Sequence, residues 1–438
     1  MQCLWLTLAD PEPATNGQLI YSKGLIEAAC RAGASLTVIG LARPENPRAS
    51  VDPRGIDWRF ADEQPKSAAR RLLSRDPMVT QRNSAEMERT LEHALVERSW
   101  DAVVFDSICA GWALRRVMRH RARSARPPRI VYIAHNHEVT VARRIASAAQ
   151  RLRRILKEID FLKVIDLERR LISAADIVTS NTPDDCRRFA ASSGGRPIVF
   201  LPPGYGGLRI ARRKIDASVP RRAILVGSLD WPPKRISLES FLAVAIAPLR
   251  RAGVELQIVG EVEVGYLADL RRRFPSVDFV GRVADVRPFM QEARVALVPD
   301  LLGGFKLKGL DYVFNRLPIL AMRNALPGMP LEDGHSIDLF DSHNALAEGL
   351  VALIDDFPGL NARQERAYTA CVGRFDWDRA TAATDRRLRS PFTMRIMQCS
   401  CTYRPKAPIL TGGRPQFPSP GRFARSVRKI ASVRQIPE

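Results

Sequence analysis

The sequence lacks the features of a membrane-spanning or secreted protein. It contains no uninterrupted run of about 18 apolar residues, the length that marks a candidate spanning helix. Its first residues carry no basic cluster ahead of an apolar core, and Asp10 and Glu12 follow closely, so we expect no signal peptide. These absences favour a cytoplasmic protein.

Cysteine is scarce and scattered. The seven cysteines form no CxxC pair, and only Cys399 and Cys401 lie close together in the chain. This pattern excludes a zinc ribbon and a small disulfide scaffold, and it fits a reducing compartment. The sequence also lacks a convincing DxD pair at the end of an apolar strand. We therefore expect no bound metal.

Motifs of nucleic-acid-binding proteins are missing too, although the net charge is +21. We find no helix-turn-helix, zinc-finger or RNP pattern, and no aromatic residues interleaved with the basic tail as a stacking platform requires. Residues 386–438 hold 12 Lys or Arg and one Glu, about half of the excess charge. This tail is rich in Pro, Ser, Gly and Arg without an apolar period, so we expect disorder there and no nucleic-acid partner.

A second basic segment, residues 143–170, interleaves Arg and Lys with Leu and Ile. One interpretation is a basic amphipathic helix, or a pair of helices, lying on an anionic lipid surface. The alternative, a commoner arrangement, is a helix that packs its apolar side on the core and leaves its charges in solvent. The pattern alone leaves both interpretations open.

Short apolar runs that end near glycine alternate with helical patterns through most of the chain. The strand-like runs are residues 4–8, 35–39, 129–134, 223–227, 254–260 and 277–281. Repeated strand–glycine–helix units predict parallel α/β layers, and 438 residues exceed a usual single core. We expect two such domains. GxGxxG is absent, so the chain carries no dinucleotide fingerprint.

The segment from Gly303 to Asp311 reads GGFKLKGLD and follows the apolar run 295–299. Glycines let backbone approach a ligand closely, and the N–H groups at a helix start favour negative charge. Lys306 and Lys308 add positive charge in the same place, which predicts a diphosphate site. If both lysines lay in a helix they would diverge by about 200°, so only one would grip phosphate. An ordinary βα loop with solvated lysines is the alternative.

Two histidines stand at the end of the strand-like run 129–134, in the sequence His135-Asn136-His137-Glu138. A histidine at such a strand end suits hydrogen bonding to sugar hydroxyls. On an extended segment the two rings would point to opposite faces, so both cannot line one cleft. Zinc binding would need further ligands that the neighbourhood does not supply, and a structural role for either ring is the alternative.

Several of these segments resemble GT-B glycosyltransferases, especially the large family-4 group of retaining enzymes. The resemblance covers residues 1 to about 388 and is strongest at 135–138, 223–234 and 303–320. The chain departs from the commoner family pattern of two glutamates, because Gly304 stands at the first position and Asp311 at the second.

The resemblance implies a GT-B-like α/β fold with two Rossmann-like domains facing a cleft and a disordered basic C-terminal tail. The implied parts are an acceptor-side domain at 1–200, a linker at 201–222, a nucleotide-sugar-binding domain with a terminal helix at 223–388, and the tail at 389–438.

The activity implied by the resemblance is metal-independent, retaining transfer of a hexose from a nucleotide sugar to a hydroxyl acceptor in bacterial polysaccharide or glycolipid synthesis. No cofactor is implied beyond the donor substrate. The acceptor would be a glycan or a lipid-linked glycan, reached at the inner face of an anionic membrane. The implied site residues are His135 and Asp311 for catalysis, Gly17, Gly227, Lys234, Gly303, Gly304, Phe305, Lys306 and Lys308 for the donor, and Asn136 and Glu138 for the acceptor side of the cleft.

Two other classes of function stay open on the sequence. A GT-B-type sugar-nucleotide epimerase would need further carboxylates and a histidine, which Glu332, Asp333 and His335 could supply. A non-catalytic nucleotide-sugar-binding or scaffold protein would explain the missing first glutamate.

Overall fold

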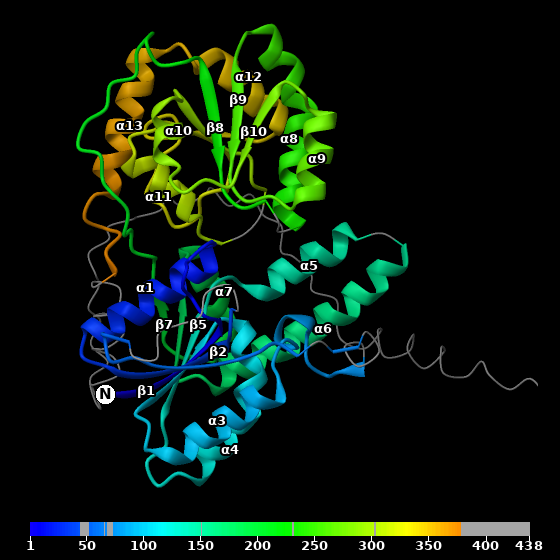
Figure 1. Ribbon diagram of the computed structural model, residues 1–438, viewed down its shortest axis with the longest axis vertical. Helices are drawn as coiled ribbons and strands as arrows, with labels where there is room; N and C mark the ends of the chain where they lie inside the picture. Colours follow the sequence, from blue (N-terminus) through cyan, green and yellow to red (C-terminus); the bar gives the residue numbers. More distant parts are fainter. Residues whose placement is uncertain are drawn as a thin grey trace, which may run out of the picture. The chain divides into compact units, whose positions relative to one another are not determined.

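The computed structural model describes residues 1–43, 52–64, 66–67, 73–149, 151–229, 232–301 and 304–377. Within these residues the chain forms two parallel β-sheets, each flanked by helices (Figure 1). The predicted pair of Rossmann-like α/β domains is thereby confirmed. The domain boundaries stay a prediction, and the predicted basic tail lies outside the described residues.

The described strands of the first sheet pair in the order β3-β2-β1-β4-β5-β6-β7, and all neighbours are parallel. The strands are β1 (Gln2–Ala9), β2 (Ser35–Leu41), β3 (Asp57–Ala61), β4 (Ala102–Asp106), β5 (Arg129–Ala134), β6 (Ile177–Ser180) and β7 (Ile198–Phe200). The helices are α1 (Gly17–Arg31), η1 (Met78–Thr80), α3 (Ala85–Glu97), η2 (Ile108–Ala113), α4 (Leu114–Arg123), α5 (Glu138–Ala148), α6 (Arg151–Ala174) and α7 (Pro183–Ser192). The strand order reverses between β1 and β4, where open α/β sheets bind ligands.

The second sheet has the described order β10-β9-β8-β11-β12-β13, again with parallel neighbours. The strands are β8 (Arg222–Val226), β9 (Glu255–Val259), β10 (Val277–Gly281), β11 (Val295–Val298), β12 (Ile319–Met322) and β13 (Asp338–Phe340). The helices are α8 (Pro232–Arg251), α9 (Val264–Arg273), α10 (Arg287–Gln291), α11 (Leu307–Phe314), α12 (His343–Leu353) and α13 (Phe357–Cys371). Here the order reverses between β8 and β11.

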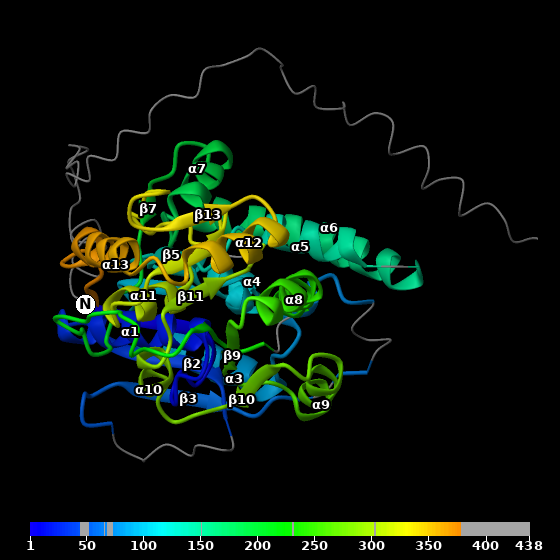
Figure 2. The same cartoon turned by 90° about the horizontal axis from the view of Figure 1, so that it is seen from above.

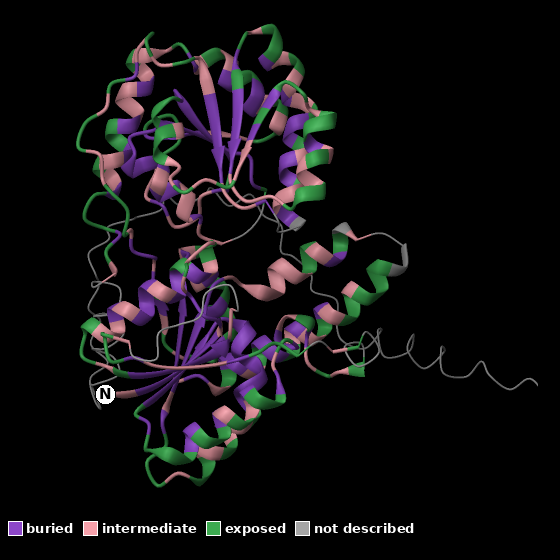
Figure 3. Cartoon of the chain, in the orientation of Figure 1, coloured by how far each residue is buried: buried purple, intermediate pink, exposed green. Residues whose placement is uncertain are grey.

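The central strands of both sheets are buried along their length. Every residue of β4 and of β11 is buried, and the strands stand out as the buried interior in Figure 3. Helices cover both faces of a parallel sheet, so its strands become nearly continuous apolar runs. This burial explains why strands such as β11 are apolar runs in the sequence.

Two local predictions need correction. The pair Pro232-Pro233 predicts that the following helix begins only near Ser237, but helix α8 begins at Pro232. Proline is tolerated in the first turn of a helix, because an N–H there has no partner within the helix. The sequence analysis also missed β3, β4, β7 and β13. Strand β3 is mostly half-buried and β7 and β13 have 3 residues each, so their patterns are weak. The apolar run of β4 is fully buried and was overlooked.

The chain returns to the first sheet after α13. The stretch from Phe375 to Asp378 predicts the start of a terminal helix, but residues from 378 on lie outside the described part. Trp377 lies beside Tyr21 of α1, with ring centroids 6.1 Å apart. A β-carbon added at Gly24 or at Gly204 would stand 2.4 Å from the Trp377 ring, so the absence of side chains there makes room for it.

Candidate active site

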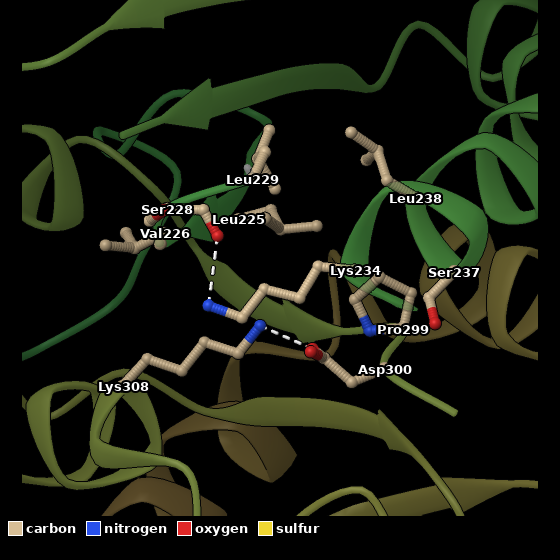
Figure 4. Close-up of a pocket in the computed structure, with 11 residues that line it drawn as sticks. Leu225, Val226, Ser228, Leu229, Lys234, Ser237, Leu238, Pro299, Asp300 and Lys308 are labelled. Carbon is tan, nitrogen blue, oxygen red and sulfur yellow. Dashed lines mark hydrogen bonds and ion pairs between the residues drawn. The ribbon is translucent and has the colours of Figure 1, made fainter. Parts of the chain in front are cut away.

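A pocket lies at the carboxyl ends of β8 and β11, beside the point where the order of the second sheet reverses (Figure 4). Its walls combine apolar residues of β8 and α8 with polar groups from the segments after each strand. The polar side chains in its lining include Ser228, Lys234, Ser237, Asp300 and Lys308. The predicted donor residues Gly227, Lys234 and Lys308 therefore meet in one pocket.

Gly227 ends β8 with a φ of +143°, a conformation that side-chain-bearing residues rarely adopt. Its amide donates to the Val259 carbonyl at 3.0 Å, which holds the turn against the neighbouring strand β9. A β-carbon at Gly227 would lie 3.9 Å from the side chain of Lys308. The positive φ, rather than a lack of space, therefore favours glycine at this position.

Lys308 and Asp300 form a largely buried ion pair in the pocket. The Lys308 Nζ lies 2.5 Å from the Asp300 Oδ2, and Asp300 is 5% exposed. Burial raises the pKa of Asp300, but the charges of Lys308 and Lys306 outweigh burial and hold it below its ordinary value. Asp300 was missed in the sequence; the signal was a carboxylate two residues after the β11 run.

Lys234 reaches the same space from α8. Its Nζ donates to the Ser228 carbonyl at 3.0 Å, and Figure 4 shows its side chain extending toward that of Lys308. The charge of Lys234 also lowers the pKa of Asp300. The first turn of α8 and the first turn of α11 therefore place cations on two sides of the pocket.

Lys306 is buried next to this pair, although it is not part of the pocket lining itself. It is 8% exposed and stands at the N-cap of α11 in an extended conformation. Burial lowers its pKa to about 8, with Asp300 opposing the change and Lys308 and Lys234 adding to it. Lys306 precedes the helix and Lys308 lies within it. Only Lys308 lines the pocket, where it pairs with Asp300, and the expectation that a single lysine grips phosphate stays a prediction.

The glycine loop before α11 touches the turn after β5. The Gly304 amide donates to Asn136 Oδ1 at 3.1 Å, and a β-carbon at Gly304 would lie 2.9 Å from the His135 carbonyl. A side chain would therefore collide with the turn. Phe305 packs on Phe375, with ring centroids 5.7 Å apart. Gly303 lies outside the described residues.

His135 is turned toward the protein interior. Its Nε2 lies 2.6 Å from Asp106 Oδ1, its ring contacts Tyr21 edge-on, and it is 9% exposed. Asp106 also accepts a hydrogen bond from Trp5 Nε1 at 3.0 Å. Burial raises the pKa of Asp106, but the charge and hydrogen bond of His135 outweigh it and lower the pKa overall. With Nε2 engaged, the ring orders the turn, and any catalytic role of His135 stays a prediction.

Asn136 and Glu138 belong to a hydrogen-bond network at the start of α5 that includes two acidic side chains. Asn136 Nδ2 donates to Glu138 Oε1 at 3.1 Å. The backbone N–H of Glu138 donates to Glu168 Oε1 at 2.8 Å, so a side chain of α6 caps α5. Burial and then the charge of Glu138 raise the pKa of Glu168 to about 8. Burial also raises the pKa of Glu138. Glu168 was missed because its partner is 30 residues away.

His137 faces a different environment from His135, as the alternation of an extended segment predicts. Its Nδ1 lies 2.8 Å from Thr140 Oγ1, and its Nε2 lies 3.9 Å from Glu168 Oε2. Burial lowers the pKa of His137. Among the described residues no group of His, Cys, Asp and Glu is arranged to hold a metal ion.

Two other predicted residues, Asp311 and Gly17, do not line the pocket. Burial raises the pKa of Asp311 to about 6, and a hydrogen bond from Tyr205 of the segment between the sheets limits the rise. Gly17 begins α1, and a β-carbon there would lie 3.8 Å from Leu307 at the start of α11. The structure thus brings the Gly17 turn close to the helix that carries Lys308, while Asp311 faces Tyr205.

Residues 220–356 match the family model described as glycosyl transferases group 1. Sucrose-phosphate synthase from Thermosynechococcus elongatus shares 15% identity and a TM-score of 0.67, over 89% of this chain and 98% of that chain. WaaG, a glycosyltransferase involved in lipopolysaccharide biosynthesis, shares 16% identity and a TM-score of 0.62, over 87% and 98%. The Anabaena protein HepE in complex with UDP shares 16% identity and a TM-score of 0.58, over 89% and 99%.

A search of curated proteins gave no significant match. Because the solved structures share so little sequence identity with this chain, their similarity establishes only its fold. The similarity extends over both sheets. The family match covers the second sheet together with the lysine pocket. The chain therefore has a GT-B-like fold, and its residues 220–356 match the family model of the glycosyl transferases group 1.

Proposed function

We propose that the protein transfers a sugar from a nucleotide-sugar donor to a hydroxyl of a glycan or lipid-linked acceptor, in polysaccharide or glycolipid synthesis. The observation that carries the proposal is the grouping of Lys234, Lys306 and Lys308 around Asp300, inside the glycosyl transferases group 1 domain. HepE has been solved with UDP and with UDP-glucose, which supports a nucleotide-sugar donor for a chain of this fold.

The lysines suit the departure of a diphosphate. When the bond between sugar and phosphate breaks, negative charge develops on the leaving oxygen, and preformed positive groups stabilise it best where water is excluded. Lys308 and Lys234 extend into the pocket and Lys306 is buried beside them. Their charges exceed that of Asp300, so the site favours an anion. Asp300 positions Lys308 rather than touching the donor.

Retention of configuration is part of the proposal and follows from the family resemblance. The anomeric configuration of the transferred sugar, read by proton NMR of early product, tests it. Transfer with inversion would remove the retaining assignment and leave the donor site as it stands.

The lysines lead us to expect activity without a divalent metal. Turnover should survive millimolar EDTA, because the developing diphosphate charge is met by ammonium groups rather than by a cation held by carboxylates. The measurement is the initial rate of product formation with and without chelator. Excess magnesium or manganese added back to the chelated enzyme is the control. Loss of turnover on chelation and its return with metal would contradict the proposal.

Donor binding should weaken at alkaline pH. Lys306, with a pKa lowered to about 8, must be protonated to attract phosphate, so affinity should be full below pH 8 and fall as the pH rises through this value. Calorimetric titration of a nucleoside diphosphate across this range measures the change. In the Lys306→Ala variant, the affinity should no longer fall as the pH rises through about 8. If it falls as in the wild type, another group causes the pH dependence.

The composition of the pocket gives less support to an epimerase than to a glycosyltransferase. Glu332, Asp333 and His335, which would serve an epimerase, are not part of its lining. Asp333 instead pairs with Arg323 at 3.1 Å. A thermal-shift screen with nucleoside diphosphates and nucleotide sugars finds the donor, because a ligand that binds only the native state raises its stability. Incubation of that donor with and without glycan acceptors then separates transfer, epimerisation and binding without turnover; either of the last two outcomes would overturn the proposal.

We place the protein in the cytoplasm, in peripheral contact with the inner face of the membrane. Among the helices of the described part of the chain, none is long and apolar enough to cross a bilayer. Contact with the membrane surface would bring a lipid-linked acceptor within reach without an anchor.

A further inference from the structure

The outer face of α6 is an unusual surface for a water-soluble protein. Helices α5 and α6 lie side by side and extend away from the first sheet in both views (Figures 1 and 2). From Arg153 to Leu156 every residue of α6 is exposed, and its second half is the part that packs on the core.

Helix α6 carries apolar residues on two opposite sides. Phe161, Val164 and Leu167 are at most 9% exposed and face the core. Ile155, Ile159 and Leu162 stand at spacing i, i+4 and i+7, so they share the other face, and their exposures are 58%, 40% and 64%. Leu156, at 43% exposure, lies next to this stripe. Single exposed apolar residues are ordinary, but a contiguous stripe marks an interaction site.

The charges around the stripe are mainly positive. The sequence from 151 to 163 holds five Lys or Arg residues against Glu158 and Asp160. Asp160 accepts the backbone N–H of Met78 at 2.8 Å, and Glu158 lies 4.0 Å from Arg154. Both acids are thus engaged locally.

We propose that the stripe of Ile155, Ile159 and Leu162, with Leu156 beside it, binds a bilayer that contains anionic lipid. The apolar side chains would enter the boundary between headgroups and acyl chains, while neighbouring Lys and Arg meet lipid phosphates. A second copy of the chain fits less well, because it would bring the same positive charges against each other. This deepens the membrane placement proposed above, but vesicle binding is measured without donor and is independent of sugar transfer.

Co-flotation of the full chain with phosphatidylcholine vesicles, with and without phosphatidylglycerol, tests the proposal. The variant Ile155→Ser/Ile159→Ser/Leu162→Ser should lose about tenfold or more in affinity for the anionic vesicles, since three exposed apolar side chains no longer insert. The matched control is Val96→Ser/Val264→Ser, which removes residues 78% and 83% exposed on other helices. The control should bind as the wild type does.

The salt dependence of vesicle binding distinguishes the contribution of the stripe from that of the basic tail. Electrostatic attraction by the tail is screened at high ionic strength, whereas insertion of apolar side chains is not. Wild type should therefore keep part of its vesicle binding at high salt, and the α6 variant should keep none. Equal binding by the α6 variant and the wild type, or binding to both vesicle types alike, would overturn the proposal.

A second measurement distinguishes lipid from protein as the partner. Sedimentation of the wild type without vesicles should show no self-association that the α6 variant abolishes. If such self-association appears and vesicle binding does not, the surface is an interface between copies and the lipid assignment is wrong. Equal affinity of both proteins for a nucleoside diphosphate shows that the variant remains folded.

Discussion

Replacing Lys306 with alanine is expected to weaken binding of a nucleoside diphosphate by about 1.5–3 kcal/mol, the range for a hydrogen bond to a charged group. Lys306 is only 8% exposed, so its charge is poorly screened by water. Its side chain makes no capping bond to α11, so alanine should leave the helix start intact. Isothermal calorimetry with the nucleoside diphosphate selected by the thermal-shift screen measures the loss.

The matched control for this experiment is Lys214→Ala. The Lys214 side chain is 82% exposed, so its removal should leave the affinity unchanged. Inorganic pyrophosphate as a second ligand shows whether the loss concerns the phosphates themselves. Wild-type affinity in a folded Lys306→Ala protein would contradict the phosphate assignment of this residue.

Replacing Asp106 with alanine is expected to lower the free energy of unfolding by about 3–5 kcal/mol, as removal of one partner of a buried pair does. Asp106 has no exposed surface. Trp5 donates a hydrogen bond to its carboxylate, and His135 pairs with it. Without the carboxylate, these buried nitrogens lose their partner. Urea unfolding followed by circular dichroism measures the change.

Acid pH gives a second signature of Asp106. The folded-state pKa is below the ordinary value, so its contribution to stability is present above that ordinary value and is lost as the pH falls through the lower folded pKa. The stability gap between wild type and Asp106→Ala should therefore narrow in strong acid. The control is Asp341→Ala, a carboxylate whose side chain is 78% exposed and pairs with Arg323 at 2.6 Å. This surface pair should contribute much less, because water screens it. If both variants lose the same free energy of unfolding, the buried pair contributes no more to stability than the surface pair.

The sequence located the central strand β5 residue for residue, because the run predicted at 129–134 is Arg129–Ala134 and five of its six residues are buried. It located the edge strand β10, Val277–Gly281, equally well although Asp278 there is exposed. A strand between two helical layers must be apolar throughout, so its pattern is visible without knowledge of its neighbours. The weak patterns of β3 and β13 belong to strands near the sheet edges, which have less to bury.

The site was predicted in part. The glycine–lysine segment was singled out from local chemistry, and the structure places Lys308 in a pocket with Gly227 and Lys234. The expected divergence of the two lysines applied to lysines that both lie in a helix, whereas α11 begins at Leu307 and Lys306 precedes it. Helix boundaries depend on capping contacts, which a pattern of residues locates only within one or two positions.

The sequence by itself determined the alternation of strands and helices, the two α/β layers and the segments that carry glycine and lysine, because apolar period and turn residues are local properties. Only the tertiary structure decided that Lys308 pairs with Asp300, that His135 turns toward Asp106, and that Ile159 is left exposed on a helix whose other side is core. The physical reason is that pairing and burial depend on which strand ends share one edge of a sheet and which helix face meets a neighbour. His135 and Asp106 are 29 residues apart, and nothing in the local sequence of either residue records the other.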